Sequence, residues 1–143
     1  LIKKIKKIDS WYRSTFKIRP KISVLGLNPH NAERRKFSEE EKIIKPAIKK
    51  LNKLKLNVSG PFPSDTIFIE EYKKCDVIVG MYHDQVLTPF KTLFKYDAIN
   101  ITLGLKYLRV SPDHGTAKNL IGKKKANSTS LLKCINFINR YGK

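Results

Sequence analysis

Lys21-Ile-Ser-Val-Leu-Gly-Leu27 is a short apolar run that ends in a polar loop, Asn28-Pro29-His30. Its length and its flanking Pro and Asn residues predict a buried β-strand. The segment before it repeats apolar residues at three- and four-residue steps, which predicts an amphipathic helix that ends before Pro20. These apolar positions are Leu1, Ile5, Ile8, Tyr12 and Phe16.

The middle of the chain predicts a second helix and then a second strand. Ser38-Glu-Glu-Glu41 has the form of a capping box, and apolar residues recur at helical spacing over residues 43–54. A Gly/Pro-rich stretch follows, in which Ser64 or Asp65 is expected to cap a short helix. Residues 75–81 form a further apolar run and predict another buried strand.

The last third of the chain predicts two strands between two helices. Thr88-Pro89 has the form of a helix N-cap with Pro at the first helical position, so we expect a helix from there to about residue 96. Residues 98–103 and 107–111 have the composition of strands. Residues 128–141 predict a closing helix that turns its apolar side chains inward. These are Leu131, Leu132, Ile135 and Ile138.

Strands that alternate with helices indicate the α/β class, here a layered α/β/α fold with a largely parallel sheet. The length of 143 residues matches one domain. No apolar run approaches the roughly 20 residues of a membrane span, so we expect no membrane partner. Residue 1 is Leu rather than Met, and the chain is therefore expected to begin inside a longer one.

The charge of the chain is +18, from 30 basic and 12 acidic residues. Of the basic residues 24 are Lys and 6 are Arg, whereas proteins that read nucleic acids favour Arg. We therefore expect solvated helix faces and no specific nucleic-acid partner, with a general attraction for small anions. The absence of an export signal and of metal-type spacing between Cys75 and Cys134 predicts free thiols in the cytoplasm.

Two histidines, His30 and His83, each follow a β-branched run. Ligands bind at the carboxyl ends of strands in open α/β sheets, so two imidazoles delivered there could share one divalent metal. Arg109 stands between Leu108 and Val110, where a charge needs a partner or a ligand. The residues alone leave open whether that partner is a structural carboxylate or a bound phosphate.

Five motifs in one order carry a family resemblance. They are Asn28-Pro-His30, Gly60-Pro-Phe-Pro-Ser-Asp-Thr66, Met81-Tyr-His-Asp-Gln85, Asn100-Ile-Thr-Leu-Gly-Leu105 and Ser111-Pro-Asp-His-Gly-Thr-Ala117. Together they resemble the C-terminal portion of 4-hydroxythreonine-4-phosphate dehydrogenase. The resemblance implies the second half of a two-domain fold like that of isocitrate and isopropylmalate dehydrogenases, and a homodimer with active sites at the subunit boundary.

The resemblance also implies the site residues. His30 and His83 would bind a divalent metal, which is zinc or else magnesium, manganese or cobalt, and Lys91, Asn100 and Arg109 would hold the substrate. The reaction would be NAD- or NADP-dependent oxidation of 4-phosphooxy-L-threonine, with decarboxylation to 3-amino-2-oxopropyl phosphate, in pyridoxal 5′-phosphate biosynthesis. No Gly-x-Gly-x-x-Gly fingerprint identifies residues that bind the cofactor.

Two further residues are candidates for a catalytic role. Asp84 lies beside His83 and could orient an imidazole or act in proton transfer. His114 could contribute to the site or simply bond to the backbone of its loop. Two residues depart from the family pattern, because Ala32 stands where the family has Gly and Lys106 where it has Pro. Ala has less backbone freedom than Gly, so the loop after His30 is expected to take another path.

The family has an N-terminal portion that is not present in these 143 residues, and with it a third metal-binding histidine and a His-Thr pair. Catalytic metal sites commonly use three protein ligands, so we expect the isolated chain to be inactive or nearly so. The final helix, 128–141, is expected to pack on that missing portion. Two alternatives stay open, a basic nucleic-acid-binding module without the chemistry and a related metal-dependent dehydrogenase or decarboxylase for another phosphorylated hydroxy acid.

Overall fold

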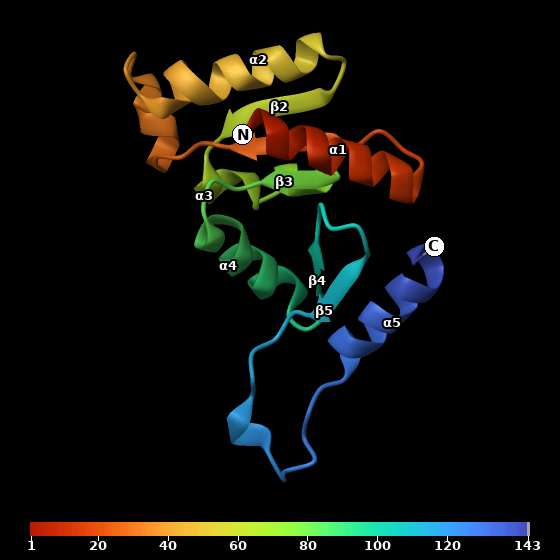
Figure 1. Cartoon of the computed structure of the whole chain (residues 1–143). Helices are drawn as coiled ribbons and strands as arrows, with labels where there is room; N and C mark the ends of the chain where they lie inside the picture. Colours follow the sequence, from red (N-terminus) through yellow and green to blue (C-terminus); the bar gives the residue numbers. More distant parts are fainter. Residues whose placement is uncertain (143) are drawn as a thin grey trace. The chain divides into compact units, whose positions relative to one another are not determined.

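The computed structural model describes residues 1–142 and divides into two compact units, Leu1–Pro89 and Phe90–Lys143. In the first unit, β1 (Lys21–Leu25) is the central strand of a three-stranded sheet (Figure 1). β2 (Asn57–Phe62) and β3 (Val77–Val79) pair with it on either side, and both run parallel to it. The α/β class with a parallel sheet, as predicted from the sequence, is confirmed.

Two helices cover one face of this sheet, α1 (Ile2–Phe16) and α2 (Lys45–Lys53). Ile5 from α1 and Leu51 from α2 are fully buried against Ile22 and Val24 of β1. Burial of such apolar side chains stabilises a fold by roughly 1.5–3 kcal/mol each, so this cluster holds the unit together. The ends of the apolar run in residues 43–54 are nevertheless exposed, at Ile43 and Leu54.

Short helical turns connect the elements of the first unit. They are η1 (Pro29–Arg34), η2 (Glu40–Ile44, wound as a π-helix), α3 (Ser64–Ile67) and η3 (Glu71–Lys74). Ser38 Oγ accepts a hydrogen bond from the Glu41 amide at 3.4 Å, which is one half of the predicted capping box. The predicted cap at Ser64 or Asp65 is wrong, because α3 begins after Pro63 without a side-chain cap.

α4 (His83–Phe94) corrects the predicted position of a helix. The helix begins at His83, well before Thr88, and Pro89 lies inside it. Pro89 has no N–H to donate to the carbonyl of Gln85, yet the helix continues past it. His83 and Asp84 are therefore the first residues of a helix, whereas the sequence predicted a helix only from Thr88.

The second unit contains an antiparallel pair of strands and one long helix. β4 (Ile99–Thr102) pairs with β5 (Arg109–Pro112), and this pair forms a sheet separate from the parallel one. A short turn, η4 (Lys118–Leu120), precedes α5 (Thr129–Tyr141). The predicted helix and the two predicted strands are present, close to their expected limits.

The inward orientation predicted for the apolar side chains of the closing helix is wrong, while the expected packing of this helix on a further portion stays a prediction. α5 packs on the strand pair through Ser130 and Cys134, which are both buried. The apolar side chains that were expected to face inward are instead 45% to 55% exposed; they are Leu131, Leu132, Ile135 and Ile138. The Ser130 hydroxyl explains the orientation, because it donates to the Ala98 carbonyl at 2.5 Å and accepts from the Asp113 amide at 2.9 Å.

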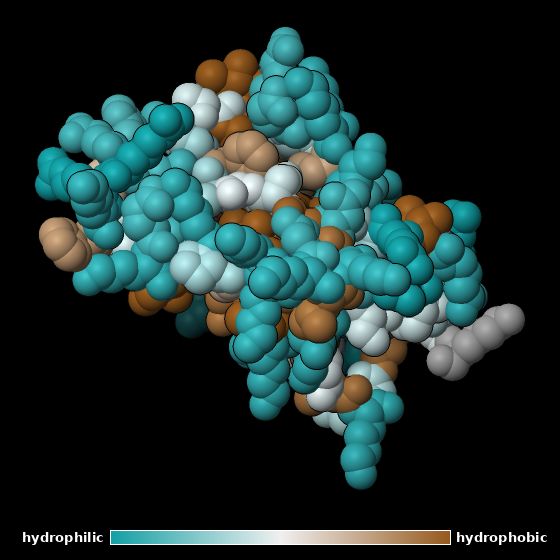
Figure 2. Space-filling model, turned by 90° about the horizontal axis from the view of Figure 1, so that it is seen from above, coloured by the Kyte–Doolittle hydropathy of each residue, from teal (hydrophilic) through white to brown (hydrophobic). Residues whose placement is uncertain are grey.

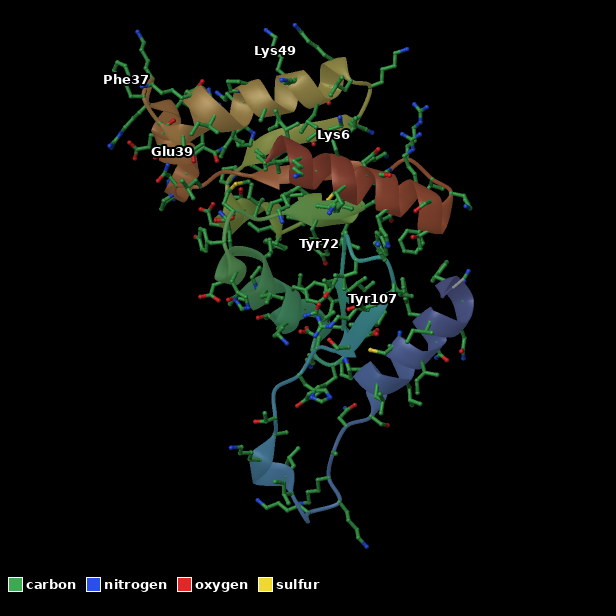
Figure 3. All side chains as sticks on the ribbon, viewed as in Figure 1. Lys6, Phe37, Glu39, Lys49, Tyr72 and Tyr107 are labelled. Atoms are coloured by element: carbon green, nitrogen blue, oxygen red, sulfur yellow. The ribbon has the colours of Figure 1, made fainter. Side chains whose placement is uncertain are left out.

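The outer surface is largely hydrophilic, as Figure 2 shows for the view from above. Lys49 projects from α2 away from the sheet (Figure 3), in agreement with a solvated helix face. Cys75 and Cys134 are free thiols, as predicted. Among residues 1–142, none of the helices combines the length and the apolar character that crossing a bilayer requires.

The turn η1 has a left-handed backbone. His30, Asn31, Ala32, Glu33 and Arg34 all have positive φ angles, from 50° to 62°. This conformation is unfavourable for residues with a Cβ atom, by roughly 1–2 kcal/mol each. Ala32 stands where the family has Gly, and it nevertheless has a positive φ. The turn therefore carries the energetic cost of a left-handed Ala.

We predict that Ala32→Gly stabilises the protein by about 0.5–1 kcal/mol, because the relief of the left-handed Ala exceeds the greater freedom that Gly has in the unfolded chain. Urea unfolding measures the change. Ala47→Gly, in the right-handed helix α2, is the matched control and should lose about 1 kcal/mol. Equal losses for the two variants would contradict the prediction.

Candidate functional site

The candidate site begins where the chain leaves β1. Gly26 continues the pairing with β2, since its amide donates to the Phe62 carbonyl at 2.9 Å. A Cβ atom at Gly26 would lie 2.1 Å from Oδ1 of Asn31, so only glycine allows this close approach. Asn31 in turn donates from Nδ2 to the Pro61 carbonyl at 3.0 Å. The loop that carries His30 is thus fixed to the end of β2.

Glu40 holds the same loop from a second direction. It is fully buried, and its Oε1 accepts hydrogen bonds from the amides of Leu27 and Asn28, both at 2.8 Å. Asn28 also donates from Nδ2 to Glu39, which is labelled in Figure 3. Burial alone would raise the pKa of Glu40, but the hydrogen bonds from Asn28 and Leu27 stabilise the carboxylate and bring its pKa below the usual value.

Gln85 holds the loop from a third direction. This residue of α4 is 7% exposed, and its Nε2 donates to the Gly26 carbonyl at 2.6 Å. Its Oε1 accepts from the Met81 amide at 2.7 Å. The end of β1 and the beginning of α4 are therefore joined through one buried carboxamide.

Each of the two predicted metal ligands lies beside a carboxylate. His30 Nε2 is 3.4 Å from Asp65 Oδ2, and His83 Nδ1 is 2.8 Å from Asp84 Oδ1. Both imidazoles are highly exposed, at 71% and 77%. Metal-binding histidines typically offer one ring nitrogen to the metal and the other to such an acceptor.

The two carboxylates share one hollow of about 460 Å³ in the first unit. Asp65 enters it from α3 and Asp84 from α4; the other lining residues are Ser64, Phe68, Tyr82, Gln85, Thr88 and Pro89. The structure thus brings together the carboxylate partners of His30 and His83. Asp84, which is expected from the sequence to orient an imidazole, lies within hydrogen-bond distance of His83.

The donor chemistry fits a divalent metal, because accessible imidazoles paired with carboxylates suit zinc and related ions. The set is nevertheless incomplete within the described part of the chain. Among residues 1–142, no three His, Cys, Asp or Glu side chains are grouped so that they could hold a metal ion. A catalytic site with three protein ligands, built on His30 and His83, would take at least one ligand from elsewhere.

The predicted substrate residues all belong to the second unit. Lys91 Nζ lies 3.0 Å from Asp113 Oδ2 and donates to the Asp113 carbonyl at 2.9 Å. Arg109 is exposed, contrary to the burial expected from its apolar neighbours, and it donates to Thr102 Oγ1 at 2.9 Å. This contact is with a neutral hydroxyl, so it does not balance the positive charge of the guanidinium.

Asn100 and Arg109 share one face of the strand pair. Asn100 pairs with Ser111, and Thr102, two residues further along β4, pairs with Arg109. Since alternate residues and directly opposed residues lie on the same face of a sheet, these side chains form one polar surface. His114 follows β5 and is exposed, and its Nδ1 lies 3.0 Å from the Gly115 carbonyl. That contact is the one expected for a loop histidine.

The comparisons with known proteins place this chain in a family. The sequence profile of the family described as "Pyridoxal phosphate biosynthetic protein PdxA" matches residues 1–138. The chain belongs to the PdxA family. A 4-hydroxythreonine-4-phosphate dehydrogenase of Xanthobacter autotrophicus is 44% identical over 123 residues, which are 85% of this chain and 35% of that protein.

Other relatives of the PdxA chain carry two names. A D-threonate 4-phosphate dehydrogenase of Salmonella typhimurium is 42% identical over 86% of this chain and 38% of its own length. The crystal structure of a 4-hydroxythreonine-4-phosphate dehydrogenase from Klebsiella pneumoniae superposes with a TM-score of 0.75 at 40% identity, over 92% of this chain and 40% of that one. The chain thus spans about two fifths of the length of the relatives it matches.

Sequence reasoning missed three residues of this candidate site, namely Glu40, Asp65 and Gln85. Glu40 lies within Glu39-Glu-Glu41, where nothing in the sequence distinguishes the buried carboxylate from its neighbours. Asp65 was interpreted as a helix cap. Gln85 lies in the same motif as His83, but a role in joining two distant segments requires the tertiary structure.

We predict that Glu40→Gln lowers the free energy of unfolding by about 1–3 kcal/mol at neutral pH, because it weakens charged hydrogen bonds to two buried amides. A carboxylate with a lowered pKa contributes stability above its unfolded pKa, and this contribution is lost as the pH falls through the lowered value. The wild type should therefore lose more stability than the variant when the pH falls below about 4.

Urea unfolding at neutral and acid pH measures both effects. Glu41→Gln is the matched control, because this adjacent carboxylate pairs with Lys45 on the surface of the helix. An equal loss in the two variants at neutral pH, or parallel pH profiles for Glu40→Gln and the wild type, would contradict the account.

Proposed function

We propose that this chain forms part of the active site of a metal-dependent dehydrogenase that oxidises a secondary alcohol of a phosphorylated hydroxy acid and passes the hydride to NAD or NADP. The observation that carries the proposal is the pair His30–Asp65 and His83–Asp84, whose carboxylates line one hollow. This arrangement occurs in a chain of the PdxA family. The oxidation would yield a β-keto acid, which then loses carbon dioxide.

In the proposed site His30 and His83 are metal ligands. A divalent metal, with zinc as the first choice and magnesium, manganese or cobalt as others, would lower the pKa of the substrate alcohol and polarise the new carbonyl. Asp65 and Asp84 fix the orientation of the imidazoles. The missing ligand comes from outside the described residues, either from a longer chain or from a second protomer of a homodimer with its active site at the subunit boundary.

Lys91, Asn100 and Arg109 are proposed to bind the phosphorylated end of the substrate. Two cations and an amide on β4, β5 and α4 offer the donors that a phosphate needs. Lys91 contacts Asp113. To bind a phosphate, Lys91 would either contact both groups at once or leave Asp113. His114 is given a secondary role at most, because its ring contacts the backbone of its own loop.

Two substrates are candidates, because relatives with two different names match at similar identity. The first is 4-phosphooxy-L-threonine, whose product is 3-amino-2-oxopropyl phosphate in the formation of pyridoxal 5′-phosphate. The second is D-threonate 4-phosphate. They differ in whether an amino or a hydroxyl group stands next to the carboxylate. We place either reaction in the cytoplasm, in keeping with the free thiols.

The basic nucleic-acid module is the less favoured reading. The lysines of α1 and α2 are exposed, as a solvated surface requires, and charge alone accounts for weak binding of any polyanion. The match to the PdxA family favours an enzyme over a binding module. Steep loss of tight duplex binding with rising salt would favour the module instead.

We predict that Zn²⁺ binds the chain weakly through His30 and His83, with water in place of the further protein ligand, and that His83→Ala lowers the affinity at least about tenfold because it removes a direct ligand. NMR of the three imidazoles during a Zn²⁺ titration measures this. His114→Ala is the matched control and should leave the affinity unchanged. Failure of the wild type to bind Zn²⁺, or an equal effect of the control, would contradict the metal site.

We further predict dehydrogenase activity when this chain replaces the corresponding portion of the Xanthobacter autotrophicus relative. NADH formation would be followed with each of the two substrates, and the preferred one identifies the reaction. Lys91→Ala should raise KM at least about tenfold through loss of a charged contact to phosphate, whereas Lys95→Ala, at the end of the same helix, should not. A folded hybrid inactive with both substrates would contradict the proposed function.

A further inference from the structure

Gln85 has a place in the structure that its position in the sequence does not explain. It is a buried residue in the first turn of an otherwise largely exposed helix, α4. Both ends of its carboxamide bond to the backbone, Nε2 to the Gly26 carbonyl at 2.6 Å and Oε1 to the Met81 amide at 2.7 Å. A carbonyl can only accept and an amide N–H can only donate, so the orientation of the Gln85 side chain is fixed.

The two bonded backbone groups belong to the two segments that carry histidines. Gly26 precedes His30 by four residues at the end of β1, and Met81 precedes His83 by two residues at the end of β3. Gln85 therefore ties one histidine segment to the other inside the protein. A buried polar pair of this kind is costly to break, because each group left behind lacks water as a substitute partner.

We propose that Gln85 is a positioning residue that sets the placement of the His30 loop relative to His83. The inference rests on the proposed function, in which both imidazoles are metal ligands. Metal sites depend on ligand placement to within about half an ångström. Residues that orient the ligands from behind typically contribute about 10–100-fold to metal affinity. Gln85 acts on the metal through the two segments and does not contact it.

The chain offers a chemically matched control in Asn52. Its carboxamide also joins two backbone groups, since Nδ2 donates to the Val58 carbonyl at 2.8 Å and Oδ1 accepts from the Val58 amide at 3.1 Å. It connects α2 with β2 and has no contact with either histidine segment in these hydrogen bonds. Loss of the Asn52 side chain therefore removes the same kind of interaction at another place in the same unit.

The experiment compares Gln85→Met with Asn52→Leu in the full chain. The three histidines give three imidazole signals, and His114, in the other unit, serves as an internal reference. Gln85→Met should shift the signals of His30 and His83 together and lower Zn²⁺ affinity about 10–100-fold. Asn52→Leu should leave these signals and the affinity unchanged, even where the two variants lose similar stability.

A second variant keeps the inference testable if Gln85→Met fails to fold. Gln85→Glu keeps an acceptor for the Met81 amide but sets a carboxylate oxygen against the Gly26 carbonyl, so the His30 signal should still shift. Unchanged His30 and His83 signals in a folded Gln85 variant, or equal shifts in Asn52→Leu, would overturn the inference. A wild type that binds no Zn²⁺ would refute the proposed metal site. The imidazole signals of the metal-free variants would still test whether Gln85 positions the two histidine segments.

Discussion

The end of β1 is held by two buried polar side chains that reach it from different elements. Glu40 accepts from the amides of Leu27 and Asn28, and Gln85 donates to the carbonyl of Gly26. Backbone polar groups of three consecutive residues thereby find hydrogen-bond partners without regular secondary structure. Buried polar groups require such partners. The left-handed turn that follows, and the imidazole of His30 within it, depend on this support.

The proposed function would separate two chemical tasks between the two units of the chain. The first unit holds the histidines with their carboxylate partners. The second holds the cations and the amide suited to a phosphate, on α4 and on one face of the β4–β5 pair. Under the proposed function the two histidines share the metal with a further ligand, and no such third group lies with them among residues 1–142. The relatives are more than twice as long, which agrees with a site assembled from more than this segment.

The sequence was sufficient where local pattern determines structure, and insufficient where a tertiary contact does. The strand at residues 21–25 follows from a short apolar run between turn residues. The start of α4 does not follow from the sequence, because Thr88-Pro89 carries a strong local helix signal. The helix in fact begins at His83, and Gln85 in its first turn makes hydrogen bonds to Gly26 and Met81. The face of α5 was mispredicted for the same reason: the buried hydroxyl of Ser130 orients the helix against its apolar stripe.

The most direct measurement of the support at the end of β1 is native-state hydrogen exchange of the amides of Leu27, Asn28 and Met81. Each amide donates to a buried side chain, so its protection should lie within about tenfold of that of Val24 in β1 and be lost only on global unfolding. Exchange at the rate of an exposed loop would contradict the account.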